Sequence, residues 1–324
     1  MKRREFLTLV GGATAAGPIT VLAQQPGPMR RIGFLRAAPP PQRELDAFLN
    51  ALADRGYVQG RNFVLVPQWG DGNVARLPEL AVALTNAAVD VIVAEGAIVA
   101  RAAAAVTLAI PIVMVGVADP FAGGLVRNLS HPGGNVTGFS SLDIDISSKV
   151  LEILKEMVPG LKRIAVLATR TIWPLFAPKQ DSAAKVLGID LNYIDMQQPE
   201  AAGAAMRQAI AAGAQGAVVR GSPFFSAVQR RVIIDNAAEF RLPVIYERHD
   251  DATQGGLMSY SADHLELYRS TAGYVARILA GENAGDLPVQ QATRFELVIN
   301  LKTAKALGLT VPPTLLARAD EVIE

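Results

Sequence analysis

The chain has 324 residues, of which 50% are hydrophobic and 19% are charged, so it can bury enough apolar surface to fold as about two domains. Its net charge of +1 argues against nucleic-acid binding, which usually needs an excess of positive charge. Cysteine is absent, which excludes disulfides, thiolate nucleophiles and cysteine metal sites. The only histidines, at positions 131, 249 and 264, are widely spaced, and we expect neither a metal nor a cofactor.

Residues 1–23 have the pattern of an export signal. Basic residues at positions 2–4 precede an apolar run from Phe6 to Leu22, and Val21-Leu22-Ala23 offers a small-residue cleavage site. The run is too short and too rich in glycine to be a good membrane span. The pair Arg3-Arg4 resembles the twin-arginine motif, which directs folded proteins across the bacterial inner membrane. We therefore expect a soluble, periplasmic product.

From Arg31 onward, short β-branched runs alternate with helical stretches. The expected strands are 32–35, 63–69, 89–94, 110–117, 164–168, 191–194, 217–219 and 244–246. The expected helices between and after them are 42–55, 75–88, 98–108, 149–157, 180–187, 201–212, 227–240, 262–280 and 301–307. Apolar strands separated by helices indicate βαβ units and parallel sheets that are covered on both faces. Because the alternation restarts near residue 149, we predict an α/β protein with two lobes.

Glycine-flanked extended stretches predict where the chain passes between the lobes. Gly133-Gly134-Asn135 precedes one such stretch, and Gly255-Gly256 precedes another. We expect crossovers near 136–140, 256–260 and 288–294. The N-terminal lobe would then contain residues 30–135 and 261–287, and the C-terminal lobe residues 140–255 and 295–324. Three crossovers form a hinge, in which a few loop residues change conformation as the lobes close.

Sequence signatures of enzymes are nearly all missing. The chain has no phosphate-binding G-x-x-x-x-G-K-[ST] loop, no G-x-S-x-G elbow and no H-E-x-x-H motif. The segment Gly70–Ala75 does satisfy G-x-G-x-x-A, and Asp90 follows at about the distance of a ribose-binding acid. It follows the second strand rather than the first, however, so we favour a turn at a helix start. An exported nicotinamide-dependent oxidoreductase remains an alternative, but we expect no enzyme.

Open α/β sheets bind ligands beyond the carboxyl ends of their strands. Candidate ligand-binding residues in the loops at those ends are Arg36, Glu95, Gly96, Ala97, Asp119, Trp173, Arg220, Ser222, Phe224, Tyr246 and Glu247. The helix starts at Gly96 and Ser222 and the two arginines favour an anionic group, whereas the two acids Glu95 and Asp119 would suit an ammonium. The aromatic rings offer stacking faces. The alternatives are tight turns, a helix cap at Asp119, core packing of the rings and solvated arginines.

Four segments of the chain, one of which contains Asp119, resemble a known family. The run Gly116-Val117-Ala118-Asp119-Pro120, the stretch 132–138 (PGGNVTG), the ending 295–309 (FELVINLKTAKALGL) and 318–323 (RADEVI) resemble the substrate-binding proteins of ABC transporters. The resemblance covers residues 31–324 and implies a type I periplasmic binding fold, with two Rossmann-like lobes and a three-crossover hinge. This branch of the family includes binders of tryptophan and related aromatic compounds.

The resemblance also implies partners. We expect a monomer that captures a small-molecule solute, an organic acid or an amino acid, and delivers it to an inner-membrane ABC permease. A sensory protein of the same fold, which presents its closed form to a receptor, remains an alternative. The sequence departs from the family pattern at Glu95, where small or hydroxyl residues are usual, and at Thr169–Trp173, which replaces a turn that contains Asn-Pro. Ligand specificity depends on such loops.

The leader generates the first testable prediction. Replacing Arg3 and Arg4 by Lys should keep the folded product in the cytoplasm, because the twin-arginine route requires the arginine pair. Fractionation of cells that express the double variant would measure this. Normal periplasmic accumulation would point instead to the general secretory route.

Overall fold

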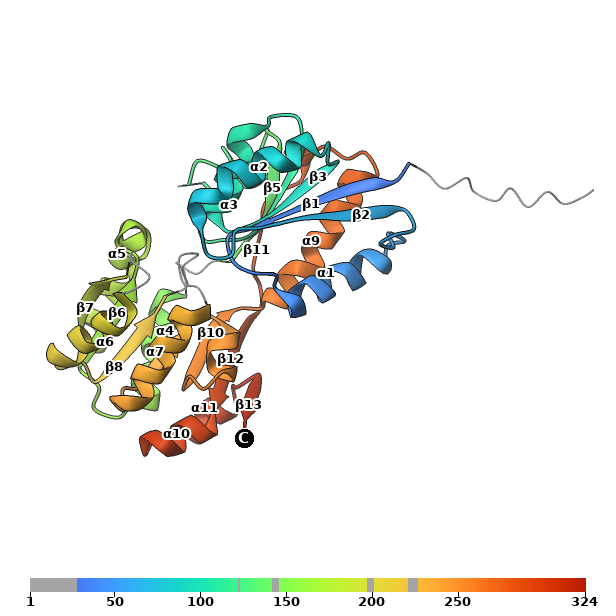
Figure 1. Ribbon diagram of the computed structural model, residues 1–324. Helices are drawn as coiled ribbons and strands as arrows, with labels where there is room; N and C mark the ends of the chain where they lie inside the picture. The colour runs from blue at the N-terminus through green and yellow to red at the C-terminus, as the bar shows by residue number, and fades with distance from the viewer. Residues whose placement is uncertain (1–27, 122, 142–145, 197–200, 221–226) are drawn as a thin grey trace, which may run out of the picture.

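The computed structural model describes residues 28–121, 123–141, 146–196, 201–220 and 227–324. Within them, two sheets that are each covered by helices form two lobes, which lie beside one another in Figure 1. The α/β architecture with two mostly parallel sheets that the sequence predicts is confirmed. The predicted leader, residues 1–23, lies outside the described residues.

The N-terminal lobe is built on a six-stranded sheet in which all strands are parallel. The strand order is β11-β5-β4-β3-β1-β2. Their bounds are β1 (Arg30–Arg36), β2 (Phe63–Trp69), β3 (Val91–Glu95), β4 (Ile112–Val117), β5 (Val136–Ser140) and β11 (Gln290–Gln291). The first three strands form βαβ units, because each is followed by a helix that returns the chain for a parallel neighbour, whereas the residues described between β4 and β5 contain no helix.

Helices cover both faces of this sheet (Figure 1). One face packs against α2 (Leu77–Asn86) and α3 (Ala97–Val106), and the other against α1 (Gln42–Ala53) and α9 (His264–Leu279). Side chains of β1 alternate between these layers, because successive residues of a strand point to opposite faces. Phe34 packs in the α1/α9 layer, whereas Leu35 packs in the α2/α3 layer.

The C-terminal lobe is built on a seven-stranded sheet of order β13-β12-β10-β9-β8-β6-β7, in which only β10 and β12 pair antiparallel. Its strands are β6 (Arg163–Ala168), β7 (Asp190–Asp195), β8 (Gly216–Val219), β9 (Val244–Tyr246), β10 (Met258–Ala262), β12 (Phe295–Asn300) and β13 (Glu321–Ile323). Helices α4 (Ser147–Met157) and α5 (Trp173–Leu187) pack on one face, and α6 (Ala201–Ala211) and α7 (Ala227–Glu239) on the other. The short helices α8 (His249–Thr253), α10 (Leu301–Leu307) and α11 (Pro313–Leu316) complete the lobe.

Two of the predicted crossover stretches are strands inside the sheets. Residues 136–140 form β5, which pairs between β4 and β11, and residues 258–260 belong to β10, which pairs between β9 and β12. The chain leaves the N-terminal sheet after Ser140, returns through Asp263 to α9, and passes again to the C-terminal sheet between Gln291 and Phe295. Flanking glycine indicated crossovers, but most residues of β5 and β10 are buried, and buried backbone N–H and C=O groups need the hydrogen-bond partners that a neighbouring strand provides.

Two other details differ from the sequence prediction. Helix α5 begins at Trp173 rather than at residue 180, so the stretch expected as a loop is the first part of a helix. Pro174 is tolerated there because the first helical turn has no partner for its missing N–H. At the other end of the chain, α11 and β13 were not predicted, and β13 extends the sheet beside β12.

The helices of the described chain include none that combines the length with the apolar character needed to cross a lipid bilayer.

The packing of β5 against β4 generates a prediction about stability. Gly138 has a φ of +131°, and a Cβ built on it would lie 2.1 Å from the carbonyl oxygen and 2.6 Å from the amide nitrogen of Met114. We expect Gly138→Ala to lower the free energy of unfolding by at least about 2 kcal/mol, because the backbone must move to relieve the clash. Urea denaturation measures this change.

Gly134 provides the matched control, because nothing lies within 4 Å of a Cβ built there. Gly134→Ala should change the free energy of unfolding by less than about 1 kcal/mol. Equal stability of the two variants would contradict the proposed close approach of β5 to β4.

Candidate functional site

Charged side chains gather where the N-terminal sheet ends. Arg36 is the last residue of β1 and Glu95 the last residue of β3, and these two strands are adjacent and parallel. Both residues continue the side-chain alternation that points toward α1 and α9. Their side chains therefore meet: Arg36 Nε forms an ion pair with Glu95 Oε2, and Arg36 Nη2 donates to Glu95 Oε1 at 3.4 Å.

Glu95 also has partners on α9 and in the other lobe. The Tyr268 hydroxyl donates to Glu95 Oε2 at 2.7 Å, and Nη1 of Arg248, from the C-terminal lobe, lies 4.0 Å from Oε1. Burial by itself would raise the pKa of the Glu95 carboxyl, but Arg36, Arg248 and Tyr268 together hold that pKa below its ordinary value. An ionised carboxylate is thus buried between the lobes, with cations on both sides.

Arg248 follows β9 and begins the segment that leads into α8. Its side chain is 21% exposed, and its Nε has no hydrogen-bond partner in the part of the chain that the structure describes. A second arginine, Arg230 of α7, is close enough for its charge to act on Arg248, and burial together with this repulsion lowers the pKa of Arg230. Arg230 Nε lies 3.5 Å from Oδ1 of the buried Asp251. Burial raises the pKa of Asp251 to about 6, so this carboxyl takes up a proton as the pH falls through that value.

A second ion pair lies deeper in the C-terminal lobe. Arg220 Nη1 is 2.9 Å from Glu247 Oε1 and donates to Ser147 Oγ at 3.0 Å, while its guanidinium lies 3.9 Å from the ring centre of Phe176. Arg220 is only 3% exposed and Glu247 only 7%. Both were predicted as ligand-binding residues, but in this structure they face each other and support the wall of the site.

Four more of the predicted residues lie after three different strands, β3, β4 and β6. Gly96, with a φ of +85°, precedes Ala97 at the start of α3, directly after Glu95. Asp119 Oδ1 accepts a hydrogen bond from the Phe121 amide at 3.0 Å, which forms a local side-chain turn; no helix follows it among the described residues before β5. Trp173 is half-buried at the start of α5, donates from its indole nitrogen to Ala168 at 3.3 Å and packs against Tyr193. It keeps part of its surface exposed at the carboxyl end of β6.

Tyr246 requires a correction. It was expected to offer an aromatic face to a ligand, but it is 1% exposed and packs in the α6/α7 layer with Ile234 and Leu242. The physical reason is strand alternation, because Glu247 points to the α4/α5 face and Tyr246 therefore points to the opposite one. Ser222 and Phe224 lie outside the described residues.

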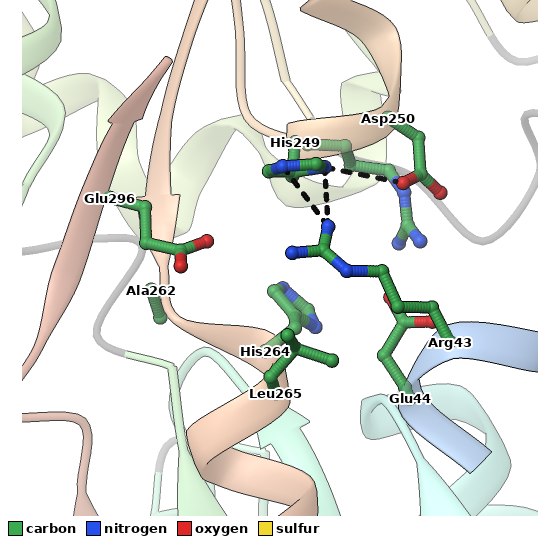
Figure 2. Close-up of a pocket in the computed structure, with 9 residues that line it drawn as sticks. Arg43, Glu44, His249, Asp250, Ala262, His264, Leu265 and Glu296 are labelled. Atoms are coloured by element: carbon green, nitrogen blue, oxygen red, sulfur yellow. Dashed lines mark hydrogen bonds and ion pairs between the residues drawn. The ribbon is translucent and has the colours of Figure 1, made fainter. Parts of the chain in front are cut away.

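Both lobes contribute to a pocket beside this charged junction, on the side where the chain crosses between the lobes (Figure 2). Its walls come from helices α1, α8 and α9 and from strands β10 and β12. The lining residues are Arg43, Glu44, Arg248, His249, Asp250, Ala262, His264, Leu265 and Glu296. The sequence predicted none of these as ligand-binding residues, although the predicted Glu247 directly precedes Arg248. One signal in the sequence could have indicated this region. His264, which lines the pocket, and Tyr268, which contacts Glu95, are four residues apart and therefore lie on the same face of α9.

Metal binding finds no support in the described residues, which contain no group of three or more His, Asp or Glu side chains suited to hold an ion.

The contact between Tyr268 and Glu95 generates a prediction. We expect Tyr268→Phe to lower the free energy of unfolding by about 1–3 kcal/mol near pH 7, because a buried carboxylate loses a hydrogen-bond donor. The lowered pKa of Glu95 means that this contribution exists above the ordinary carboxyl pKa and is lost as the pH falls through the folded-state pKa. Urea denaturation at about pH 7 and at about pH 3.5 would therefore show a smaller difference from wild type in acid.

Tyr57→Phe is the matched control, because Tyr57 is a half-buried tyrosine that follows α1. A Tyr268→Phe variant as stable as this control near pH 7 would show that the hydrogen bond does not stabilise Glu95.

Comparison with known proteins adds the family. The sequence model described as ABC transporter substrate binding protein matches residues 39–323. A tyrosine-binding protein of Clostridioides difficile (strain R20291) is 28% identical over 273 residues, which are 81% of this chain and 75% of that protein.

Solved structures agree with this fold. A conserved domain protein from Vibrio cholerae has a TM-score of 0.83 and 29% identity, over 91% of this chain and 99% of its own. The ABC domain in complex with L-Trp from Streptococcus pneumonia has a TM-score of 0.83 and 22% identity, over 91% and 100%. The ligand-free, open structure of a substrate binding protein with adhesive properties from Clostridium difficile has a TM-score of 0.66 and 24% identity, over 91% and 99%. With two parallel-sheet lobes and a family match over most of its length, the chain belongs to the substrate-binding proteins of ABC transporters, a family of binding proteins and not of enzymes.

Proposed function

We propose that this protein binds a small solute with a carboxylate group, an organic acid or an amino acid, between its two lobes and delivers it to an inner-membrane ABC permease. The observation that carries the proposal is Arg248, a cation at the junction of the lobes whose contact with a carboxylate is long, 4.0 Å, and whose Nε has no hydrogen-bond partner among the described residues.

The charges around Arg248 support an anionic ligand group. Three arginines of the site each have a carboxylate: Arg36 pairs with Glu95, Arg220 with Glu247 and Arg230 with Asp251. Arg248 shares Glu95 with Arg36. Burial by itself would lower the pKa of Arg248, but Glu95 raises it, and so do three acids that form no ion pair with it among the described residues, Asp251, Asp250 and Glu44. A guanidinium binds a carboxylate through two parallel hydrogen bonds, so a solute carboxylate would complete its coordination.

Aromatic side chains at the strand ends of both lobes indicate the character of the rest of the solute. Trp173 in the C-terminal lobe and Trp69, at the end of β2 beside Arg36, are both half-buried and leave aromatic surface at strand ends. The names of two relatives, one tyrosine-binding and one in complex with L-Trp, favour an aromatic amino acid within the proposed class. An ammonium group would lie near one of the two acids predicted for it, Glu95 at the end of β3 and Asp119 after β4.

The family and the predicted leader, residues 1–23, support delivery to a permease, because the leader would export the folded chain to the periplasm. The leader also argues against a nicotinamide-dependent oxidoreductase, and so does the Gly70–Ala75 segment. Gly72 donates its amide to Ala37 and Asn73 caps the short helix that follows, as in a turn at a helix start.

A thermal-shift screen of the mature chain against amino acids, aromatic acids and nucleosides tests the solute class. A ligand that binds only the folded protein raises its melting temperature by mass action. Carboxylate-bearing compounds should raise it, and their amide or decarboxylated analogues should not. Stabilisation by nucleosides or neutral sugars alone would contradict the proposal.

Calorimetry of a variant tests the anchor. Arg248→Gln should weaken binding of the solute found in the screen by at least about tenfold, because removal of a buried charged partner costs about 2–5 kcal/mol. The exposed Arg207 of α6 gives the control variant Arg207→Gln, which should bind as wild type does. Wild-type affinity of Arg248→Gln, with its fold intact by circular dichroism, would remove Arg248 from the site.

A further inference from the structure

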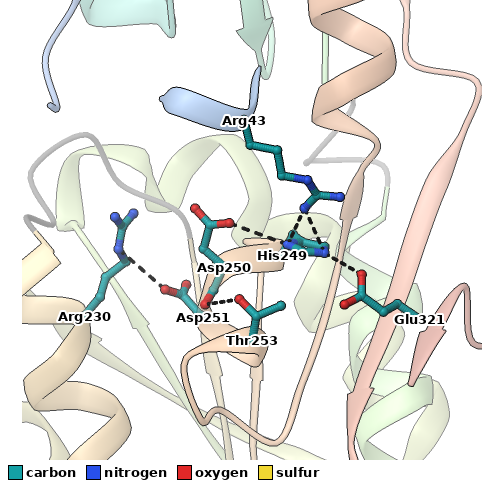
Figure 3. A network of polar contacts seen from close by, with 7 residues as sticks. All are labelled: Arg43, Arg230, His249, Asp250, Asp251, Thr253 and Glu321. Atoms are coloured by element: carbon teal, nitrogen blue, oxygen red, sulfur yellow. Dashed lines mark hydrogen bonds and ion pairs between the residues drawn. The ribbon is translucent and has the colours of Figure 1, made fainter. Parts of the chain in front are cut away.

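A contact between the lobes lies on the hinge side of the pocket and is centred on His249. Arg43, on α1 of the N-terminal lobe, reaches across to His249, the first residue of α8 in the C-terminal lobe (Figures 2 and 3). Its Nη1 lies 2.9 Å from Nδ1 and 3.0 Å from Nε2 of the ring. The two residues are 206 positions apart in the sequence, so only the arrangement of the lobes joins them.

The geometry shows which form of the ring suits Arg43. An atom nearly equidistant from both ring nitrogens lies over the face of the imidazole and not in its plane, where a lone pair would accept a hydrogen bond. A cation over an aromatic face is attracted by a neutral ring and repelled by a protonated one. Arg43 therefore contacts His249 more favourably when the imidazole is neutral.

Acidic groups of the C-terminal lobe hold the ring in place. His249 Nε2 is 2.8 Å from Oε2 of Glu321 on β13, and Nδ1 is 3.5 Å from Oδ1 of Asp250 (Figure 3). These partners stay with His249 when the lobes move, because all three belong to one lobe. The other charged or titratable groups around it are Glu44 on α1, Arg248 and Asp251 beside α8, Arg230 on α7, His264 on α9 and Glu296 on β12.

We propose that His249 is a positioning residue for lobe closure: its neutral ring receives Arg43 when the lobes close, and its protonation favours the open form. The consequence for the bound molecule rests on the proposed function, since acidification would then weaken the hold on the solute. The opening itself requires no solute.

Linkage gives the sign of the effect. The hydrogen bond with Asp250 raises the pKa of His249, burial lowers it, the hydrogen bond with Glu321 raises it and Arg43 lowers it; the net effect is a pKa above the ordinary histidine value. Closure adds the lowering contribution of Arg43, so the closed form binds this proton less tightly than the open form. As the pH falls through the His249 pKa, the population therefore shifts toward the open form. If the pKa in the two forms differs by about half to one unit, the closed-to-open ratio changes about three- to tenfold.

Distances between the lobes measure this ratio directly. Since the chain contains no cysteine, single cysteines for spin labels can replace the exposed Val82 on α2 and Val186 on α5, one in each lobe. In the solute-free, mature chain we expect the distance distribution to move toward the open form between about pH 8 and about pH 5.5. A distribution that does not change with pH would overturn the proposal.

Variants identify the titrating group. His249→Gln and Arg43→Gln should each abolish the pH response, the first because the ring is gone and the second because closure no longer brings a cation to it. Arg43 is exposed, so its variant should fold even if a change at His249 disturbs α8. His131→Gln, at an exposed histidine of the N-terminal lobe, is the matched control and should keep the full response.

Asp251 is the competing explanation, because its pKa of about 6 places its titration in the same range. A pH response that survives in His249→Gln and disappears in Asp251→Asn would overturn the assignment to His249. Once the screen identifies a solute, its affinity should fall about three- to tenfold over the same range in wild type and not in Arg43→Gln. If the lobes respond to pH but the thermal-shift screen finds no carboxylate solute, this inference stands and the proposed function alone is contradicted.

Discussion

The buried carboxylate of Glu95 is the constraint on which the arrangement of this protein depends. An ionised group removed from water is costly unless cations and hydrogen-bond donors surround it. Arg36 and Tyr268 supply these within the N-terminal lobe, and Arg248 supplies a further charge from the C-terminal lobe. If the lobes separate, water replaces Arg248 as the neighbour of the Glu95 carboxylate. The relative position of the lobes is therefore coupled to the stability of the ionised form of Glu95.

This coupling explains why the site contains so many arginines and yet leaves one of them incompletely paired. Arg220 and Arg230 neutralise acids within their own lobe and stabilise the wall. Arg248 lies in the short segment between β9 and α8, where it faces the other lobe. Because it shares Glu95 with Arg36, the proposed solute carboxylate would bind it without breaking an ion pair that its own lobe needs.

The two sides of the junction have different chemistry. Arginine groups that stay charged at every physiological pH gather around Glu95, whereas the hinge side carries His249, whose charge changes near neutral pH. Asp250 lies between them: its hydrogen bond with His249 is the main cause that lowers its pKa to about 2, and Arg248 lowers it further. The proposed binding and the proposed closure therefore share residues of one short helix, α8, and its preceding segment.

The sequence by itself determined the alternation of strands and helices, the two lobes and the family resemblance, because hydrophobic periodicity and local motifs are properties of neighbouring residues. It also located Arg36 and Glu95, since the carboxyl ends of parallel strands meet at one edge of a sheet. Tertiary structure alone decided that β5 and β10 pair inside the sheets and that Tyr246 faces the core. It alone brought Tyr268, Arg248 and the Arg43–His249 contact to the junction. These contacts join residues far apart in the chain, and their partners depend on how helices pack on sheets and how the lobes meet, which no local pattern encodes.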